Sequence, residues 1–321
     1  MNLICNAFAF ISEYETGRLD VNRNNEDQIK EIYLKNSCVS LISAKRINPE
    51  EEVALCTNIE LPKWCVDILE KEYIKIFLIP FDCFLFNKDT KWSLAFYKIC
   101  VLKHLIDTYD FENICLMDCD TIVNKEFGDL WEEAAYGVLM YNTFDTYNHQ
   151  MRKEIKKEFQ RIFPSCDCRN NEYFAGGEIT GNKIFIEGLI TLCEDIYDIM
   201  QKNEGGTTVY GDEFFWYAID KLKPGLIIPG NGYYEHYWTY KGFRLISTNF
   251  FYKKVAIMHF PVEKNKGLKK IFNYYVRKGR FPEKRMLWNF LGLPQPDGRN
   301  PYIWSMLSIV KSVLLGKNSR K

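Results

Sequence analysis

The sequence predicts an α/β fold in which a mixed, mostly parallel sheet is flanked by helices. Apolar runs of strand length, such as residues 74–79 and 113–117, alternate with longer segments that have apolar residues at helical spacing, such as residues 93–109. This alternation is typical of strand–helix–strand units. Apolar residues make up 47% of the 321 residues, which is enough for a sizeable core.

The expected elements follow in chain order. Seven apolar runs predict strands at residues 3–11, 52–58, 74–79, 113–117, 136–142, 226–228 and 255–260. Helices are predicted at residues 61–71, 93–109, 149–163, 185–202 and 212–222, and residues 24–43 are expected to be polar at first and then helical. Pro62 stands near a helix start and Gly205-Gly206 marks a helix end. A polar loop is expected at 166–173 and a turn at 230–232.

The most informative segment is residues 114–123. Four apolar residues run directly into Asp118-Cys119-Asp120, which a second apolar run follows. Ligands of open α/β sheets bind at the carboxyl ends of the strands, so two acids at that point can converge on one cation. Mg²⁺ and Mn²⁺ prefer such oxygen ligands and share them with phosphates. The alternative is a solvated turn that matches the pattern by chance.

Composition narrows the class of protein. Lys and Arg balance Asp and Glu at 42 each, but residues 263–321 carry 14 Lys or Arg against 3 Asp or Glu. A basic tail on an acidic body favours an anionic surface or substrate. No nucleic-acid recognition motif occurs, so we expect no nucleic-acid partner.

The cysteines and the first residues predict the compartment. Most of the 11 cysteines are expected to be small buried hydrophobic side chains, and no spacing typical of a zinc site occurs. Residues 1–5 lack the charged start of a signal peptide, and residues 302–315 are too short to cross a bilayer. Free thiols without such a signal predict a cytoplasmic protein.

Residues 92–98, the helix that follows and residues 113–123 resemble the donor-site core of glycosyltransferases with the GT-A fold. The resemblance is strongest to glycosyltransferase family 8, the glycogenin-like group, and covers residues 90–267. It implies a Rossmann-like nucleotide-diphospho-sugar transferase fold. We expect a catalytic domain at residues 1–262 and a basic, helical extension at 263–321.

The resemblance also assigns residues to the donor site. It implies that Asp118, Asp120 and His259 bind manganese or magnesium, and that Lys264 or Lys266 binds the diphosphate; the sequence does not choose between these two lysines. The residues that it places around the cofactor and the donor are Asn6, Ala7, Phe8, Lys98, Asp118, Cys119, Asp120, Gly176, Gly177, His259, Lys264, Lys266 and Gly267. The alternative for His259 is a core histidine whose hydrogen bonds are satisfied within the protein. The alternative for Lys98 is a lysine exposed to solvent.

Asp212 and Glu178 are the candidate catalytic residues. Asp212 would hydrogen-bond donor hydroxyls, serve as the N-cap of the aromatic helix that follows, or do both. Glu178 follows two glycines that permit close backbone approach, and would lie near the donor sugar; the alternative is a tight turn with an exposed acid. The aromatic residues 233–240 are expected on the acceptor side or in the core.

These observations predict a glycosyltransferase that moves a hexose from a UDP-sugar to a saccharide acceptor, free or lipid-linked, in polysaccharide biosynthesis. Retention of configuration is implied by the resemblance alone. The basic C-terminal segment would either dock on the body or rest on the inner face of a membrane.

Two other function classes stay open. Asp-x-Asp after an apolar strand is also the nucleophile motif of haloacid-dehalogenase-like phosphatases and phosphotransferases. Against that, the motif lies 118 residues into the chain, and no Asp-Asp pair follows it. The second class is a non-catalytic saccharide-binding module with the same fold.

Overall fold

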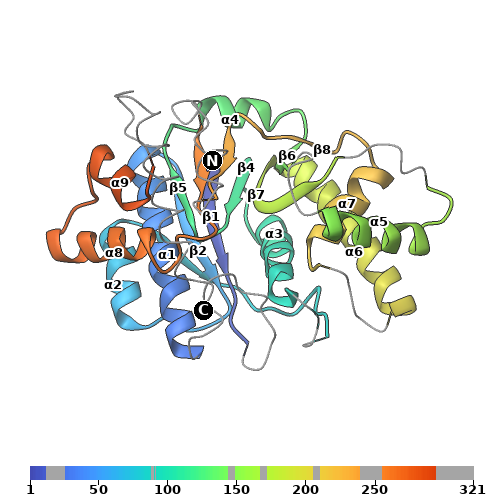
Figure 1. Cartoon of the computed structure of the whole chain (residues 1–321), viewed down its shortest axis with the longest axis horizontal. Coiled ribbons are helices and arrows are strands. Elements are labelled where there is room, and N and C mark those ends of the chain that lie inside the picture. The colour runs from blue at the N-terminus through green and yellow to red at the C-terminus, as the bar shows by residue number, and fades with distance from the viewer. Residues whose placement is uncertain are drawn as a thin grey trace, which may run out of the picture.

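The structure is a computed structural model (Figure 1). It describes residues 1–11, 26–87, 90, 92–143, 149–166, 172–204, 210–238 and 255–293. The predicted helix-end signal at residues 205–206, the last two residues of the aromatic segment 233–240 and the apolar stretch 302–315 lie outside these ranges.

The main sheet has seven strands in the order β3-β2-β1-β4-β7-β6-β8. The strands are β1 (Asn2–Phe8), β2 (Glu52–Thr57), β3 (Lys75–Leu78), β4 (Asn113–Met117), β6 (Val138–Asn142), β7 (Phe174–Asn182) and β8 (Ile227–Pro229). All pairs are parallel except those of β7, which runs antiparallel to both β4 and β6. The predicted mixed, mostly parallel α/β sheet is therefore confirmed.

A second, three-stranded sheet lies at the end of the main one. It consists of β5 (Thr121–Val123), β10 (Ile257–His259) and β9 (Tyr234–His236), with β10 in the middle. In its register His259 is opposite Thr121 on one side and His236 on the other. This small sheet carries His259, from late in the chain, to the residues that follow β4.

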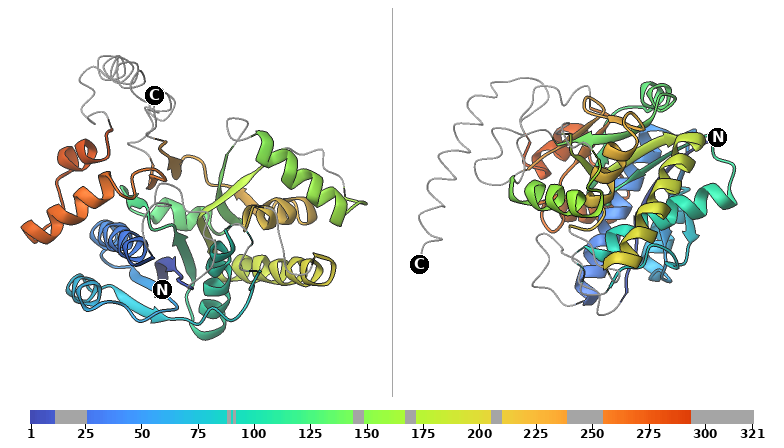
Figure 2. Two further views of the ribbon diagram at one scale, coloured as in Figure 1. Left: turned by 60° about the horizontal axis from the view of Figure 1, so that its bottom comes forward. Right: turned by 90° about the vertical axis from the view of Figure 1, so that its right-hand side faces the viewer.

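Helices cover both faces of the main sheet (Figures 1 and 2). They are α1 (Glu26–Ile47), α2 (Lys63–Lys71), α3 (Tyr97–Thr108), which follows the short 3-10 helix η1 (Ser93–Phe96), α4 (Gly128–Glu133), α5 (His149–Ile162), α6 (Lys183–Glu204), α7 (Glu213–Leu222), α8 (Gly267–Lys278) and α9 (Lys284–Phe290). Helices α1, α2, α8 and α9 pack on one face, and α3, α5, α6 and α7 pack on the other.

The apolar residues of the central strands divide between two cores, as the alternation of side chains along a strand requires. On β1, Leu3 and Cys5 join the core under α3, α6 and α7, whereas Ile4 joins the core under α1 and α8. Burial on both faces explains why these strands appear in the sequence as continuous apolar runs rather than alternating ones.

One segment differs from its prediction. The tight turn considered around Gly176, Gly177 and Glu178 is wrong, because these residues lie inside strand β7. Two successive glycines are typical of a turn. Here they are instead interior residues of an antiparallel strand between β4 and β6.

The described part of the C-terminal extension packs on the body. Leu268, Ile271 and Tyr275 of α8 and Trp288 of α9 are buried in the core that α1 shares. Among the helices of the described ranges, none combines the length and the apolar content that a membrane crossing needs.

Candidate metal centre

The two acids follow β4 directly. All five residues of β4 are buried, and the Asp118 backbone N–H donates to the Gly177 carbonyl at 2.7 Å. The Thr121 hydroxyl donates to the Asp118 carbonyl at 2.8 Å, which closes the turn between β4 and β5. The Asp118 side chain remains 35% exposed, whereas that of Asp120 is 2% exposed. The pair therefore combines one acid that is open to solvent with one that is enclosed.

His259 faces both acids. Its Nε2 lies 3.2 Å from Asp120 Oδ2 and 3.8 Å from Asp118 Oδ2. One ligand atom from each of the three residues lies within 4.8 Å of the others. The structure thus brings together the three residues that the sequence predicts as metal ligands.

The donor set suits a hard divalent ion. In an octahedral Mg²⁺ or Mn²⁺ site with ligands at about 2.1 Å, adjacent ligand atoms lie about 3 Å apart. The separations of 3.2 and 3.8 Å from His259 Nε2 are close to that value, so small side-chain movements would close the site. Two carboxylates and one imidazole leave positions for phosphate oxygens or water.

Glu178 and His236 lie behind His259. The Nδ1 atom of His259 is 2.9 Å from Glu178 Oε1, and His236 Nε2 is 2.9 Å from Glu178 Oε2. The Glu178 side chain has no exposure. The exposed acid of the turn alternative is therefore wrong, because the Glu178 carboxylate is enclosed between two imidazoles.

Two lysines form ion pairs with the acids of the site. Lys98 Nζ donates to the Gly176 carbonyl at 2.5 Å and lies 3.0 Å from Asp212 Oδ2 and 3.5 Å from Asp118 Oδ1. The Lys264 ammonium contacts Asp120. Both side chains are largely buried; Lys264 pairs with Asp120, whereas Lys98 is shared between Asp212 and Asp118.

The second candidate for the phosphate role, Lys266, lies elsewhere. It is exposed and occupies the N-cap position of α8. Gly267 follows it at the point where α8 meets α9: a Cβ there would lie 2.8 Å from the Phe290 carbonyl, and the Gly267 N–H donates to Glu263. Of the two lysines, only Lys264 reaches the acidic pair in the described structure.

The surrounding charges set the pKa values of the site. Burial lowers the pKa of the His259 imidazolium, but Asp120 and Glu178 outweigh burial and raise it to about 10. Burial raises the pKa of Asp120, but Lys264 and His259 hold it well below its ordinary range. Burial likewise raises the pKa of Glu178, and the two histidines lower it to about 2. Asp120 and Glu178 are therefore ionised at neutral pH.

The two glycines of β7 allow these groups to meet. A Cβ on Gly177 would lie 2.8 Å from two ring atoms of His259. A Cβ on Gly176 would lie 2.3 Å from Asp212 Oδ2 and 2.4 Å from Trp216 Nε1. Glycine is therefore needed at both positions because a side chain would collide with these groups, and not because the backbone turns there.

Asp212 lies at the N-terminus of α7 without capping it through its side chain. Its Oδ2 accepts from Trp216 Nε1 at 3.2 Å and pairs with Lys98. Asp212 is thus the N-cap residue of α7 by position, as the structural alternative predicts, but its side chain makes no capping hydrogen bond. The residue is 4% exposed, and its carboxylate lies beside Lys98.

The remaining predicted residues divide between the turn that carries the acids and the core of the protein. Asn6 is fully buried and donates to the Met117 carbonyl at 2.9 Å, next to the acids. Cys119 is 6% exposed between them. Ala7 is partly buried, and Phe8 stacks on Tyr33 with ring centroids 6.3 Å apart. Asn6 and Cys119 thus support the turn, and Phe8 packs on α1.

The aromatic segment belongs partly to the core. Tyr234 and Tyr237 have no exposure, and the Tyr234 hydroxyl donates to Thr180 Oγ1 at 2.6 Å. His236, from the same segment, stacks on Tyr141 with ring centroids 3.9 Å apart. The sequence alone does not single out His236, because its partners Glu178 and His259 lie 58 and 23 residues away in the chain.

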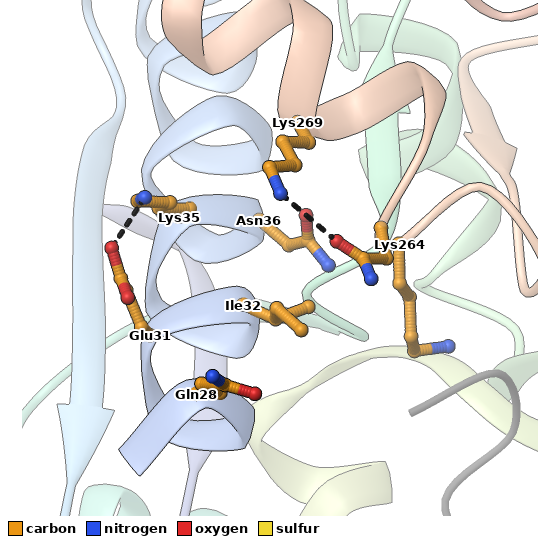
Figure 3. A pocket seen from close by; sticks show the side chains of 8 residues that line it. Gln28, Glu31, Ile32, Lys35, Asn36, Lys264 and Lys269 are labelled. Atoms are coloured by element: carbon orange, nitrogen blue, oxygen red, sulfur yellow. Dashed lines mark hydrogen bonds and ion pairs between the residues drawn. The ribbon is translucent and has the colours of Figure 1, made fainter. Parts of the chain in front are cut away.

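A polar hollow of 390 Å³ lies beside the site, between α1 and the start of α8 (Figure 3). Its lining residues are Gln28, Glu31, Ile32, Lys35, Asn36, Lys264, Asn265 and Lys269. Asn36 is 1% exposed, and neither polar atom of its amide has a hydrogen-bond partner among the described residues. Lys264 lines this hollow and contacts Asp120, so the hollow and the acidic pair adjoin.

No protein-family model matches the sequence of this chain, and no curated protein is significantly similar to it. Among solved structures, the apo form of mouse xyloside xylosyltransferase 1 is similar, with a TM-score of 0.48 and 12% identity. The match covers 81% of this chain and 97% of that chain. At this level of similarity, we base no functional argument on it.

Proposed function

We propose that this chain is a metal-dependent glycosyltransferase that moves a hexose from a UDP-sugar to a saccharide acceptor. One observation carries the proposal: Asp118, Asp120 and His259 converge within 4.8 Å at the carboxyl end of β4. That edge of an open α/β sheet is where ligands bind.

The proposed chemistry concerns the leaving diphosphate of the donor. Manganese or magnesium, when bound, would offset the negative charge that grows on the diphosphate as the bond to the sugar breaks. Asp118 and Asp120 would hold the ion through carboxylate oxygens, and His259 through Nε2. Its Nδ1 faces Glu178, which would fix the ring, and a bound metal would take the place of the proton on Nε2.

Lys264 and Lys98 would contact the donor in this proposal. Lys264 contacts Asp120 and also lines the polar hollow, so its ammonium is close to both the metal ligands and a space for a polar ligand. A donor diphosphate would accept hydrogen bonds from Lys264 as Asp120 turns to the ion. Lys98 and Asp212 form a buried pair beside Asp118, which would orient that acid and contact the donor.

Glu178 takes a positioning role in this account. Its carboxylate contacts two imidazoles and has no exposure, so it would act through His259 rather than on the sugar. Asp212 remains the candidate for a residue that hydrogen-bonds donor hydroxyls. The acceptor, a lipid link and a role in polysaccharide biosynthesis stay predictions from the sequence.

The phosphatase alternative fits the site less well. In that chemistry the second acid of the motif acts as a general acid and must take up a proton. Asp120 is held ionised by Lys264 and His259, which lower its pKa. A residue in this environment is a poor proton donor.

The experiment is a panel of nucleotide sugars tested by thermal shift and by UDP release, with and without Mn²⁺. We expect one UDP-sugar to raise the melting temperature only when Mn²⁺ is present, and to yield UDP over time. The Asp118→Asn and Asp120→Asn variants should lose both effects. The exposed Asp129, which pairs with Lys125 on the surface, provides the matched control Asp129→Asn.

Three outcomes would contradict the proposal. Hydrolysis of an aryl phosphate by the wild type but not by Asp118→Asn would favour the phosphatase alternative. Saccharide binding without any UDP release would favour the binding module. Manganese-dependent shifts of equal size in the wild type and Asp120→Asn would place the metal elsewhere.

A further inference from the structure

A second group of metal-ligating side chains lies outside the site described above. It consists of Asp82 and Cys83, from the segment after β3, and of Cys100 and His104, from α3. Cys100 and His104 are four residues apart on the helix and therefore lie on the same face, one turn apart. The segment after β3 passes over that face.

The four side chains are close enough to share one ion. One ligand atom from each residue lies within 4.8 Å of all the others. Asp82 Oδ1 is 2.8 Å from His104 Nε2 and 3.6 Å from Cys100 Sγ. In a tetrahedral zinc site, with Zn–S about 2.3 Å and Zn–N or Zn–O about 2.0 Å, ligand atoms lie about 3.3–3.8 Å apart. The cluster needs only small movements to reach this geometry.

We propose that Asp82, Cys83, Cys100 and His104 form a structural zinc site. Two sulfur ligands with one imidazole and one carboxylate match the preference of Zn²⁺, which is softer than Mg²⁺ or Mn²⁺. Four protein ligands close a tetrahedral shell and leave no position for a substrate, which is typical of structural rather than catalytic zinc.

Thiolate is the form of cysteine that binds metal. Zinc would therefore bind Cys83 and Cys100 as thiolates and displace their protons to solvent.

A second thiol pair shows that this cluster is not an ordinary contact between buried cysteines. Cys38 and Cys65 lie with their sulfurs 3.7 Å apart and are fully buried. Among the described residues, neither belongs to a group of potential metal ligands. Asp82 and His104, by contrast, are 54% and 31% exposed, so an ion can reach the proposed site from solvent.

The position of the site suggests what zinc would stabilise. Lys98 of the candidate metal centre is two residues before Cys100, on the first turn of α3. The segment after β3 already contacts this turn, through the Tyr97 hydroxyl on the Ile79 carbonyl at 2.9 Å. Zinc would fasten the segment to the helix and so hold the turn that carries Lys98. The inference does not depend on the proposed glycosyl transfer.

The test is the zinc content of the untagged full-length protein, measured by elemental mass spectrometry after gel filtration. We expect about one zinc per chain, lost in Cys100→Ser and in His104→Asn. Cys38→Ser is the matched control for loss of a buried thiol, and Asp118→Asn is the control for the other metal centre. Both controls should keep the zinc.

A second measurement covers the case in which the variants do not fold. In the wild type, zinc should protect the partly exposed Cys83 from alkylation under native conditions, and a chelator should remove this protection. Cobalt in place of zinc should show the charge-transfer absorption of thiolate ligands. Zinc far below one equivalent, or equal zinc in Cys100→Ser and wild type, would overturn the proposal.

Discussion

The two nitrogens of His259 face opposite partners. Nδ1 lies 2.9 Å from the enclosed carboxylate of Glu178, while Nε2 lies 3.2 Å from Asp120. A carboxylate behind a ligating histidine fixes the orientation of the ring and makes the free nitrogen a better ligand. Strand β7, which carries Glu178, therefore supports His259 of β10, the proposed metal ligand.

Glu178→Gln tests this support. The substitution keeps the size of the side chain but removes the charge that holds the imidazole, so Mn²⁺ affinity should fall by about 10- to 100-fold. Calorimetric titration with Mn²⁺ measures the change. The exposed Glu187 on α6 gives the control Glu187→Gln, which should bind Mn²⁺ as the wild type does. Equal affinity in all three proteins would remove Glu178 from the metal centre.

The two acids should differ in their effect on stability without metal. Asp120→Asn leaves the buried Lys264 ammonium without its partner carboxylate, and such a loss costs about 3–5 kcal/mol. Asp118 is more exposed, so Asp118→Asn should cost about 1 kcal/mol or less. Urea unfolding in the presence of a chelator gives both values. A larger loss for Asp118→Asn than for Asp120→Asn would contradict the described contacts.

Gly177→Ala should displace His259. The added Cβ would lie 2.8 Å from the imidazole ring, and overpacking of this kind costs about 1–3 kcal/mol. The metal affinity should fall together with the stability. Gly128→Ala is the matched control, because a Cβ at that position has nothing within 4 Å. If Gly177→Ala kept wild-type Mn²⁺ affinity, His259 would not be a ligand.

The hollow beside Lys264 should bind part of the donor nucleotide. Asn36 has an amide without a hydrogen-bond partner among the described residues, so Asn36→Leu should leave stability unchanged or raise it slightly. If the amide contacts a ligand, the same variant should weaken UDP binding by about tenfold, which corresponds to one lost hydrogen bond. Unchanged UDP affinity would place the nucleotide elsewhere.

The raised pKa of Glu213 predicts that the free energy of unfolding depends on pH. Burial and the neighbouring Asp212 raise its pKa from 4.5 to about 8, so the folded chain holds this proton more tightly than the unfolded chain. Its stabilising contribution is complete below about pH 4.5 and is lost as the pH rises towards 8. Glu213→Gln should flatten the fall in unfolding free energy between pH 5 and pH 8. If the unfolding free energy of Glu213→Gln fell as steeply with pH as that of the wild type, Glu213 would not be the group that titrates.

Much of the fold could be predicted because it depends on local pattern. Residues 113–117 were expected as a strand and form β4. The helix expected at 61–71 begins after Pro62 as α2. Strand β7 could not be predicted in the same way, because the reason for its glycines lies in Asp212 and His259, which come much later in the chain.

The candidate site also has a part that the sequence predicts and a part that only the fold brings together. Asp118 and Asp120 follow from one motif on one strand, so the sequence shows them as a pair. Their contacts with Lys264 and His259 depend on the small sheet, whose strands come from three separate segments. The cluster around Cys100 has no sequence spacing typical of zinc, because its two halves, 82–83 and 100–104, meet only in the fold.

The most direct test of the central claim is anomalous diffraction from crystals soaked with UDP and MnCl₂. We predict a manganese peak within about 2.5 Å of carboxylate oxygens of Asp118 and Asp120, with UDP phosphate oxygens in the same shell. A manganese ion bound to UDP at any other place in the molecule would contradict the account.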